Sequence, residues 1–360
     1  MRILIDINHP AHVHLFRKAA EEWKRKGHQI FWVARDKDIV VDLLHRYGIE
    51  FELLSTHRQG VIGLALEMII RDWKLLCLAH EYKPDVMLGT SVNITHVGRI
   101  IPARSIYFTE SDSHLIRLIT YLSFPFADAI VIPNVLPDIW PASKQVKHSS
   151  YHKLAYLHPN RFAPDPEVLA KLGVKPSEPF FIVRFIAWGA SHDIGQGGLT
   201  LGAQRRIIKV LSSYGHVFIS TEVELQPEFD PYLIPIEPDQ MHDALYYATM
   251  FVGDSQSMTT EAAILGTPAL RCNSMVGRTT VIDELEYKYD LCYGFLPDDV
   301  DGLMTKIDEL LQTEDLKLKW QKKRERLLAD KVDLTEWMVN FVEDYVNYGK
   351  GYSPPNGGKR

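Results

Sequence analysis

Residues 248–272 read ATMFVGDSQSMTTEAAILGTPALRC, and this stretch decides the fold class. A short apolar run, Met250 to Val252, stops at Gly253 and gives way to a cluster of small polar residues. A helical apolar pattern follows, ends near Gly266 and leads into a second apolar run. A strand, a polar corner, a helix and another strand in this order are typical of a parallel α/β sheet, which binds ligands at the carboxyl ends of its strands.

The same alternation of strands and helices extends to both sides of this stretch. It begins with a buried strand at residues 2–7, reaches a strand at 129–134 and restarts with a strand at 180–185. Residues 159–179 between the two runs carry five prolines and one short helix, which indicates a linker. We therefore expect two Rossmann-like, doubly wound α/β domains, an N-terminal one at 1–158 and a C-terminal one at 180–332, followed by a helix at 333–348 and a disordered tail at 349–360.

Composition excludes several classes of protein. The 360 residues are 46% hydrophobic and 24% charged, which is ample for two packed cores. The net charge of −6 carries no basic excess, so nucleic acid is not an expected partner. The three cysteines lack metal-ligand spacing, and the N-terminus lacks the features of a signal peptide. These features predict a cytoplasmic protein with reduced thiols.

The most apolar run is VIGLALEMII at residues 61–70, which Glu67 interrupts. It is too short to span a bilayer. Two interpretations stay open: an amphipathic helix packed on the core, or a helix that makes peripheral contact with a membrane surface.

The polar corner at residues 253–257 has the properties of a phosphate site. The first N–H groups of a helix have no partner within the helix, and the helix dipole adds partial positive charge there. Ser255 and Ser257 can cap the helix or donate to phosphate oxygens, and Glu261 can accept hydrogen bonds from a ribose diol. The pattern predicts a nucleotide diphosphate at this corner. The alternative is a helix cap with a solvated acid in its first turns.

The run GDSQSMTTEAAILGTPALRC resembles the donor-binding motif of GT-B enzymes. It is most similar in form to the Asp-Ser-Gly-Gly…Glu-Glu-Ala…Leu-Gly-Lys-Pro run of the non-hydrolysing UDP-N-acetylglucosamine 2-epimerases. Over about residues 1–347 the chain resembles the domain-of-unknown-function 354 family, often described as predicted glycosyltransferases. The resemblance implies a GT-B fold, with two domains facing across a cleft and a last helix that crosses back to the N-terminal domain.

The same resemblance implies roles for the residues of the corner. The backbone N–H groups of Ser255, Gln256 and Ser257 would hold the diphosphate, and Glu261 would bind the ribose. The sequence departs from the epimerase pattern because Gln256 and Ser257 stand where glycines are usual, and Thr260 replaces the first of the paired acids.

The resemblance implies that two further segments of the C-terminal domain bind the donor. The loop within residues 184–198 would lie over the donor, with Ser191 or His192 near the phosphates. The segment 234–243 would hold the base, lined by Ile236 or Met241. Neither a dinucleotide-binding glycine pattern nor a P-loop is present in this sequence.

The loop NHPAHVH at residues 8–14 follows the first strand. Inverting GT-B transferases carry a similar loop, Gly-His-x-x-Pro, and His12 stands in register with its histidine. Imidazole, with a pKa near 6.5, suits a base that removes a hydroxyl proton at neutral pH. The alternative is a histidine that caps or packs at the helix start. No carboxylate or cysteine cluster accompanies these histidines, so a metal is not expected.

The segment FTESDSH at residues 108–114 follows another strand. By its place in the resemblance, Glu110 aligns with a catalytic glutamate of the epimerases. The epimerases carry Gly-Asp at the end of the preceding strand, whereas LGTS here has Thr90, so one acid is missing and epimerisation is disfavoured. Glu110 or Asp112 would otherwise bind acceptor hydroxyls, orient a histidine or cap a turn.

The resemblance thus implies a metal-independent, cofactor-independent glycosyltransferase. It would move a sugar from a nucleotide-diphosphate-sugar donor, a UDP-sugar, to a glycan or lipid-linked acceptor in cell-surface glycan or polysaccharide synthesis. His12 and Glu110 would be the catalytic residues. Two alternatives stay open: an isomerase like UDP-N-acetylglucosamine 2-epimerase, and a non-catalytic nucleotide-sugar-binding protein. The sequence is compatible with an oligomer.

Overall fold

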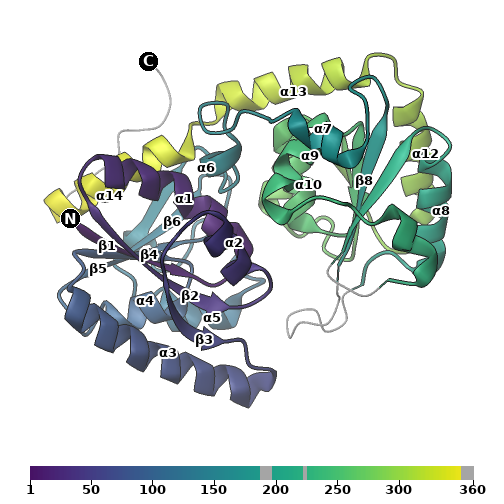
Figure 1. The fold of residues 1–360 in the computed structure, drawn as a ribbon. Helices are drawn as coiled ribbons and strands as arrows, with labels where there is room; N and C mark the ends of the chain where they lie inside the picture. Colours follow the sequence, from purple (N-terminus) through teal and green to yellow (C-terminus); the bar gives the residue numbers. More distant parts are fainter. Residues whose placement is uncertain (187–196, 222–224, 350–360) are drawn as a thin grey trace. The chain divides into compact units, whose positions relative to one another are not determined.

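The chain folds into two compact α/β units, which confirms the expected fold class. The computed structural model describes residues 1–186, 197–221 and 225–349 (Figure 1). The first unit comprises Met1–Arg161 together with Lys331–Arg360, and the second comprises Phe162–Asp330. Each unit has its own parallel sheet and its own core.

The first unit is built on a seven-stranded sheet in the order β3-β2-β1-β4-β5-β6-β7. All neighbouring strands in it run parallel, so its central strands are buried on both faces and consist of aliphatic runs. At the centre, Ile5 of β1 pairs with Trp32 of β2 and Leu88 of β4. The strands are β1 (Arg2–Ile7), β2 (Gln29–Asp36), β3 (Glu52–Thr56), β4 (Val86–Gly89), β5 (Arg104–Phe108), β6 (Ala129–Pro133) and β7 (Gln145–His148).

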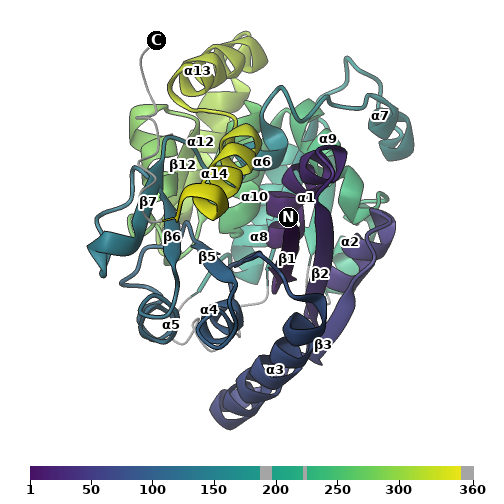
Figure 2. The ribbon, with the colours of Figure 1, turned by 90° about the vertical axis from the view of Figure 1, so that its left-hand side faces the viewer.

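Helices cover both faces of this sheet (Figures 1 and 2). On one face, α1 packs against α2, α6 and α14; on the other, α4 lies between α3 and α5. The last helix, α14, follows the second unit in sequence but packs on the first. The first group comprises α1 (Pro10–Arg25), α2 (Val40–Arg46), α6 (Leu154–Leu157) and α14 (Leu334–Tyr348); the second comprises α3 (Gly60–Tyr82), α4 (Val92–Val97) and α5 (Arg117–Ser123).

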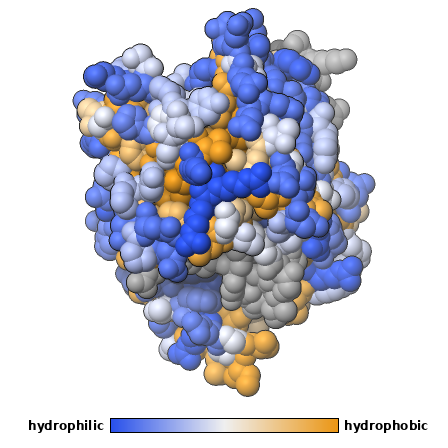
Figure 3. Space-filling model, turned by 90° about the vertical axis from the view of Figure 1, so that its right-hand side faces the viewer, coloured by the Kyte–Doolittle hydropathy of each residue, from blue (hydrophilic) through white to orange (hydrophobic). Residues whose placement is uncertain are grey.

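The second unit has a five-stranded parallel sheet in the order β12-β11-β10-β8-β9. Its strands are β8 (Phe180–Phe185), β9 (His216–Thr221), β10 (Met250–Gly253), β11 (Ala269–Cys272) and β12 (Cys292–Phe295). Its α-helices are α7 (Glu167–Leu172), α8 (Leu201–Leu211), α9 (Met241–Tyr247), α10 (Gln256–Leu265), α11 (Thr280–Asp283), α12 (Val300–Leu311) and α13 (Leu316–Asp330). Seen from the side where α8 and α12 lie in Figure 1, the surface mixes hydrophilic side chains with smaller hydrophobic areas (Figure 3).

The contact between β8 and β10 requires a glycine at the end of β10. Gly253 pairs with Arg184, and a Cβ at Gly253 would lie 2.6 Å from the Arg184 carbonyl oxygen. Because that atom belongs to the backbone of a central strand, it cannot move without disturbing the sheet. The glycine therefore sets the position of the corner that follows it.

We predict that Gly253→Ala destabilises the second unit by roughly 1–3 kcal/mol, because the added methyl group overpacks a backbone contact. Urea denaturation measures the change in the free energy of unfolding. Gly202→Ala on α8 is the matched control, since its added Cβ would have its nearest neighbour 4.0 Å away. Equal stability of the two variants would contradict the packing argument.

Candidate functional site

The corner between β10 and α10 is tied to both neighbouring strands. The Asp254 carboxylate accepts a hydrogen bond from the Ile186 N–H at 3.0 Å, just after β8. On the other side, the Asn273 side-chain amide donates to the Asp254 carbonyl oxygen at 2.8 Å, just after β11. Asp254 and Asn273 are both buried. These bonds hold the start of α10 in a fixed place at the carboxyl edge of the sheet.

The hydroxyl groups of the corner make their hydrogen bonds within the helix. Ser255 is the N-cap of α10, and its Oγ accepts the Met258 N–H at 3.4 Å. The Thr259 and Thr260 hydroxyls donate to the carbonyl oxygens of Ser255 and Gln256, at 2.6 and 2.8 Å. The backbone N–H groups of Gln256 and Ser257, in the first turn, are those for which an α-helix itself supplies no acceptor. The corner is thus both capped and able to offer amides to an anion.

Glu261 lies one turn further along α10 and faces a histidine. His242 Nε2 on α9 is 3.4 Å from Glu261 Oε1, and both side chains are largely buried. The helices α9 and α10 pack against each other, which fixes this pair. The sequence analysis selected Glu261 but missed His242, although His242 directly follows Met241 in the segment expected to line the donor. A buried carboxylate held by imidazole is a suitable acceptor for a sugar diol.

The remaining residues selected for donor binding occupy different places. Met241 is the first residue of α9 and is half-buried. Ile236 is half-buried in the segment between the 3₁₀ turns Pro227–Tyr232 and Pro238–Gln240. Ser191 and His192 lie outside the described residues.

In the first unit, His12 contacts the residue that follows β4. The Thr90 hydroxyl is 2.8 Å from His12 Nδ1 and 3.1 Å from His12 Nε2. His9 caps α1 by accepting the Ala11 N–H with its own Nδ1, at 3.2 Å. The capping role thus belongs to His9, which leaves the His12 ring for other chemistry. Thr90 stands where the epimerase pattern has an acid, and its hydroxyl group directly contacts His12.

The surroundings of His12 keep its ring neutral. Burial lowers the pKa of His12 well below its usual value, and the nearby basic side chains His9, His152, Lys153 and Lys37 lower it further. A neutral imidazole carries a proton on only one of its two ring nitrogens at neutral pH. It can therefore accept one.

Glu110 is engaged by two groups that follow β7. Its Oε1 is 2.6 Å from Lys153 Nζ, and its Oε2 accepts the His152 N–H at 2.6 Å. Burial alone would raise the pKa of Glu110, but the charge of Lys153 and these hydrogen bonds outweigh it and lower the pKa from 4.5 to about 2. Glu110 is therefore ionised, with both oxygens occupied. In this arrangement it holds Lys153 and the start of α6 in place.

Three functional-site candidates of the first unit escaped the sequence analysis: His148, His152 and Lys153. Burial lowers the pKa of His148 to about 3 and that of His152 to about 4. Both ring nitrogens of His148 and Nε2 of His152 are buried without a hydrogen-bond partner within the described residues. The histidines lie at and after the end of β7, a strand that the sequence did not reveal, beside the carboxylate of Glu110.

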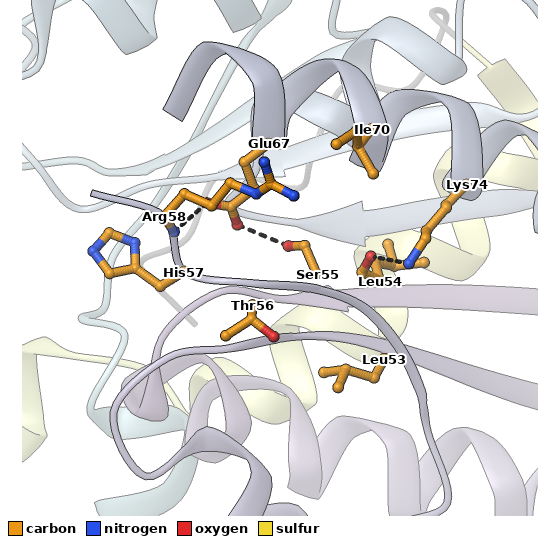
Figure 4. A pocket seen from close by; sticks show the side chains of 9 residues that line it. All are labelled: Leu53, Leu54, Ser55, Thr56, His57, Arg58, Glu67, Ile70 and Lys74. Carbon is orange, nitrogen blue, oxygen red and sulfur yellow. Dashed lines mark hydrogen bonds between the residues drawn. The ribbon is translucent and has the colours of Figure 1, made fainter. Parts of the chain in front are cut away.

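A cavity of about 390 Å³ lies between the end of β3 and α3 in the first unit (Figure 4). Its central acid, Glu67, receives hydrogen bonds from Arg35 at 2.6 and 2.7 Å. The Ser55 hydroxyl and the Arg58 N–H add bonds of 2.7 and 3.0 Å. Burial favours the neutral acid, but these bonds outweigh it and lower the pKa of Glu67 from 4.5 to about 2. This carboxylate is fully paired, so it ties α3 to the sheet.

The described residues do not form a cluster of metal-binding side chains in either unit. Across residues 1–186, 197–221 and 225–349, no group of three or more His, Cys, Asp or Glu side chains is arranged to hold an ion.

Comparisons with known proteins agree with this architecture. The model of a family described as "Protein of unknown function (DUF354)" matches residues 1–347. An uncharacterized protein of Methanocaldococcus jannaschii is 23% identical over 288 residues, which cover 75% of this chain and 81% of the relative. Its similarity extends through most of both chains.

Solved structures with the same fold include epimerases and transferases. A UDP-N-acetylglucosamine 2-epimerase is similar with a TM-score of 0.67 and 15% identity, covering 100% of this chain and 99% of that one. The Neisseria meningitidis epimerase bound to UDP-GlcNAc gives 0.64 and 12%, with 96% and 100% covered. Acinetobacter baumannii MurG gives 0.57 and 14%, with 96% and 100% covered. At these identities the similarity establishes the GT-B fold alone.

We predict that Lys153→Met raises the pKa of His12, because it removes a nearby cation and leaves the negative charge of Glu110 unbalanced. Titration of the His12 ring resonances by NMR in selectively labelled protein measures the shift. Lys18→Met is the control. Lys18 lies on α1, the helix that contains His12, but it pairs with Glu21 on the surface. If the pKa of His12 is the same in the wild type and in Lys153→Met, the two side chains are not electrostatically coupled.

Proposed function

This chain belongs to the DUF354 family, and we propose that it is a glycosyltransferase that uses a nucleotide-diphosphate sugar as donor. The observation that carries the proposal is the start of α10 in the second unit. There, the amides of Gln256 and Ser257 stand at a fixed helix N-terminus, and the Glu261–His242 pair follows one turn later. Amides suit a diphosphate, and the carboxylate suits the adjoining ribose.

A UDP-sugar is the donor that the comparisons support best. The Neisseria meningitidis epimerase has the same fold and binds UDP-GlcNAc. A second solved structure, the S. aureus MnaA–UDP co-structure, is similar with a TM-score of 0.67 and 13% identity. The acceptor would be a glycan or a lipid-linked sugar, whose hydroxyl group attacks the donor.

Side chains and amides of this chain can serve each step of the proposed transfer. His12 takes the proton of the acceptor hydroxyl, and the acceptor oxygen forms a bond to the anomeric carbon of the sugar. The bond from that carbon to the phosphate oxygen breaks, and the nucleoside diphosphate leaves with the electron pair. The amides of Gln256 and Ser257 stabilise the negative charge that develops on the leaving group. Each step uses groups of this chain and needs no redox partner.

An isomerase related to the UDP-N-acetylglucosamine 2-epimerases is the second candidate, because several of the similar structures have that activity. Two features of this chain favour transfer instead. Thr90 stands where the epimerase pattern has an acid, and Glu110 is ionised and bound to Lys153. A base without an accompanying acid suits removal of a hydroxyl proton better than the exchange of a proton on carbon.

Incubation with UDP-GlcNAc separates the candidates. NMR is used to follow the sugar with and without a panel of glycan and lipid-linked acceptors. Release of UDP that depends on an acceptor supports the glycosyltransferase. Formation of the 2-epimer without an acceptor supports the isomerase, and binding without any conversion under either condition supports a nucleotide-sugar-binding protein.

We predict that Glu261→Ala weakens the binding of UDP by about tenfold to a hundredfold, because a hydrogen bond to a charged group contributes about 1.5–3 kcal/mol. Isothermal titration calorimetry measures the affinity. Glu325→Ala removes an exposed acid of α13 in the same unit and should leave the affinity unchanged. Identical affinities of the two variants would remove Glu261 from the ribose site.

We predict that His12→Ala lowers kcat by about 10²–10⁴-fold, the usual contribution of a general base, while the affinity for UDP stays the same. Acceptor-dependent release of UDP gives kcat, and calorimetry gives the affinity. His45→Ala on α2 replaces an exposed histidine of the same unit as a control. Normal turnover in the His12 variant would exclude it as the base.

A further inference from the structure

The long helix α3 presents a row of apolar side chains to solvent. Ile62, Leu66, Ile69 and Trp73 recur at spacings of three and four residues, so they share one face of the helix. Ile62 and Trp73 expose 78% and 65% of their surface, and Val61 beside them is even more exposed. We call Val61, Ile62, Leu66, Ile69 and Trp73 the α3 stripe. A contiguous exposed row of this kind usually marks a docking surface.

The α3 stripe does not contribute to the core of the unit. The opposite face of α3 supplies the buried residues Glu67, Arg71, Leu75 and Ala79. Arg71 donates to Asp6 of β1 at 2.6 Å, and Glu67 is bound by Arg35 of β2. The helix is thus fastened to the sheet by its other side.

The exposed charges that flank the α3 stripe are positive. Arg58 precedes the helix and Lys74 follows Trp73, and both residues are exposed, although Lys74 Nζ also donates to the Leu54 carbonyl oxygen at 2.8 Å. Between them, residues 59–73 of this described segment contain no exposed acid. Glu67 is buried and paired with Arg35, and Asp72 pairs with His96 at 2.8 Å. The surface therefore combines apolar side chains with a cation at each end.

This arrangement of charge favours an anionic surface over a second copy of the chain as the partner. If a second copy of the chain docked through α3, an antiparallel pair of helices would place Arg58 opposite Lys74. A parallel pair would place each cation opposite its own counterpart. Both arrangements bring like charges together, whereas an anionic lipid surface attracts both ends at once. Trp73 is also of the residue type enriched at the boundary between lipid and water.

We propose that the α3 stripe docks the protein on the surface of an anionic membrane. The helix would lie in the plane of the interface, with its apolar side chains among the upper acyl chains and with Arg58 and Lys74 at the lipid phosphates. Within the described residues no helix is long and apolar enough to cross a bilayer. The proposal does not depend on the nucleotide-sugar activity, and its test uses no substrate.

The test is co-sedimentation of the full chain with vesicles of phosphatidylcholine, alone or mixed with phosphatidylglycerol. Wild-type protein is expected to sediment with the mixed vesicles more than with phosphatidylcholine alone. The double variant Ile69→Ser/Trp73→Ser is expected to lower the partition coefficient by about tenfold or more, since it removes two large apolar groups from the contact. The double variant Arg58→Gln/Lys74→Gln is expected to abolish the preference for the anionic lipid.

The matched control is Leu318→Ser/Tyr287→Ser, which replaces two exposed apolar side chains of the second unit. It should bind vesicles like the wild type. Circular dichroism and urea denaturation verify that every variant is folded. Failure of the wild type to bind anionic vesicles would overturn the proposal. So would a wild-type dimer in sedimentation equilibrium that Ile69→Ser/Trp73→Ser converts to monomer, because the stripe would then bind a second copy.

Discussion

A parallel sheet ends all of its strands at one edge, and this constraint places the polar groups of both units. In the first unit, His12, Thr90, Glu110 and Lys153 follow four different strands and are far apart in the sequence. The sheet order β1-β4-β5-β6-β7 brings them to the same edge, where His12 contacts Thr90 and Glu110 binds Lys153. In the second unit, the carboxyl edge of its own sheet carries the corner between β10 and α10, and Asp254 ties this corner to the ends of β8 and β11. The candidate chemistry is thus a consequence of topology.

Charge at the edge of the first unit is balanced in a way that fixes the protonation states. Glu110 is ionised because Lys153 lies beside it, and burial together with the nearby basic side chains lowers the pKa of His12 and keeps the imidazole neutral. Glu67 and Glu110 both have pKa values lowered from 4.5 to about 2. Such carboxylates stabilise the folded state above pH 4.5, and the stabilisation is lost as the pH falls from 4.5 toward 2. The buried histidines add to this loss, because protonation favours the unfolded chain below pH 6.5.

The sequence predicts the architecture and the corner between β10 and α10 because both depend on local patterns. Aliphatic runs reveal the buried strands, and the polar cluster after Val252 reveals the start of α10. Two edge strands are missed, since QVKH of β7 and CYGF of β12 are short and lack an aliphatic run. Missing β7 also hides His152 and Lys153, whose importance depends on a contact with Glu110. His242 is missed for the same reason: only the packing of α9 on α10 brings it to Glu261.

The central claim is that the first-turn amides of α10 bind a diphosphate. Titration of ¹⁵N-labelled protein with UDP, followed through the backbone amide resonances, tests it most directly. The account predicts the largest shifts at Gln256 and Ser257, with a smaller change at His242, and little change at Gly302 in the first turn of α12. Saturating UDP that leaves Gln256 and Ser257 unshifted, or that perturbs the start of α12 equally, would contradict it.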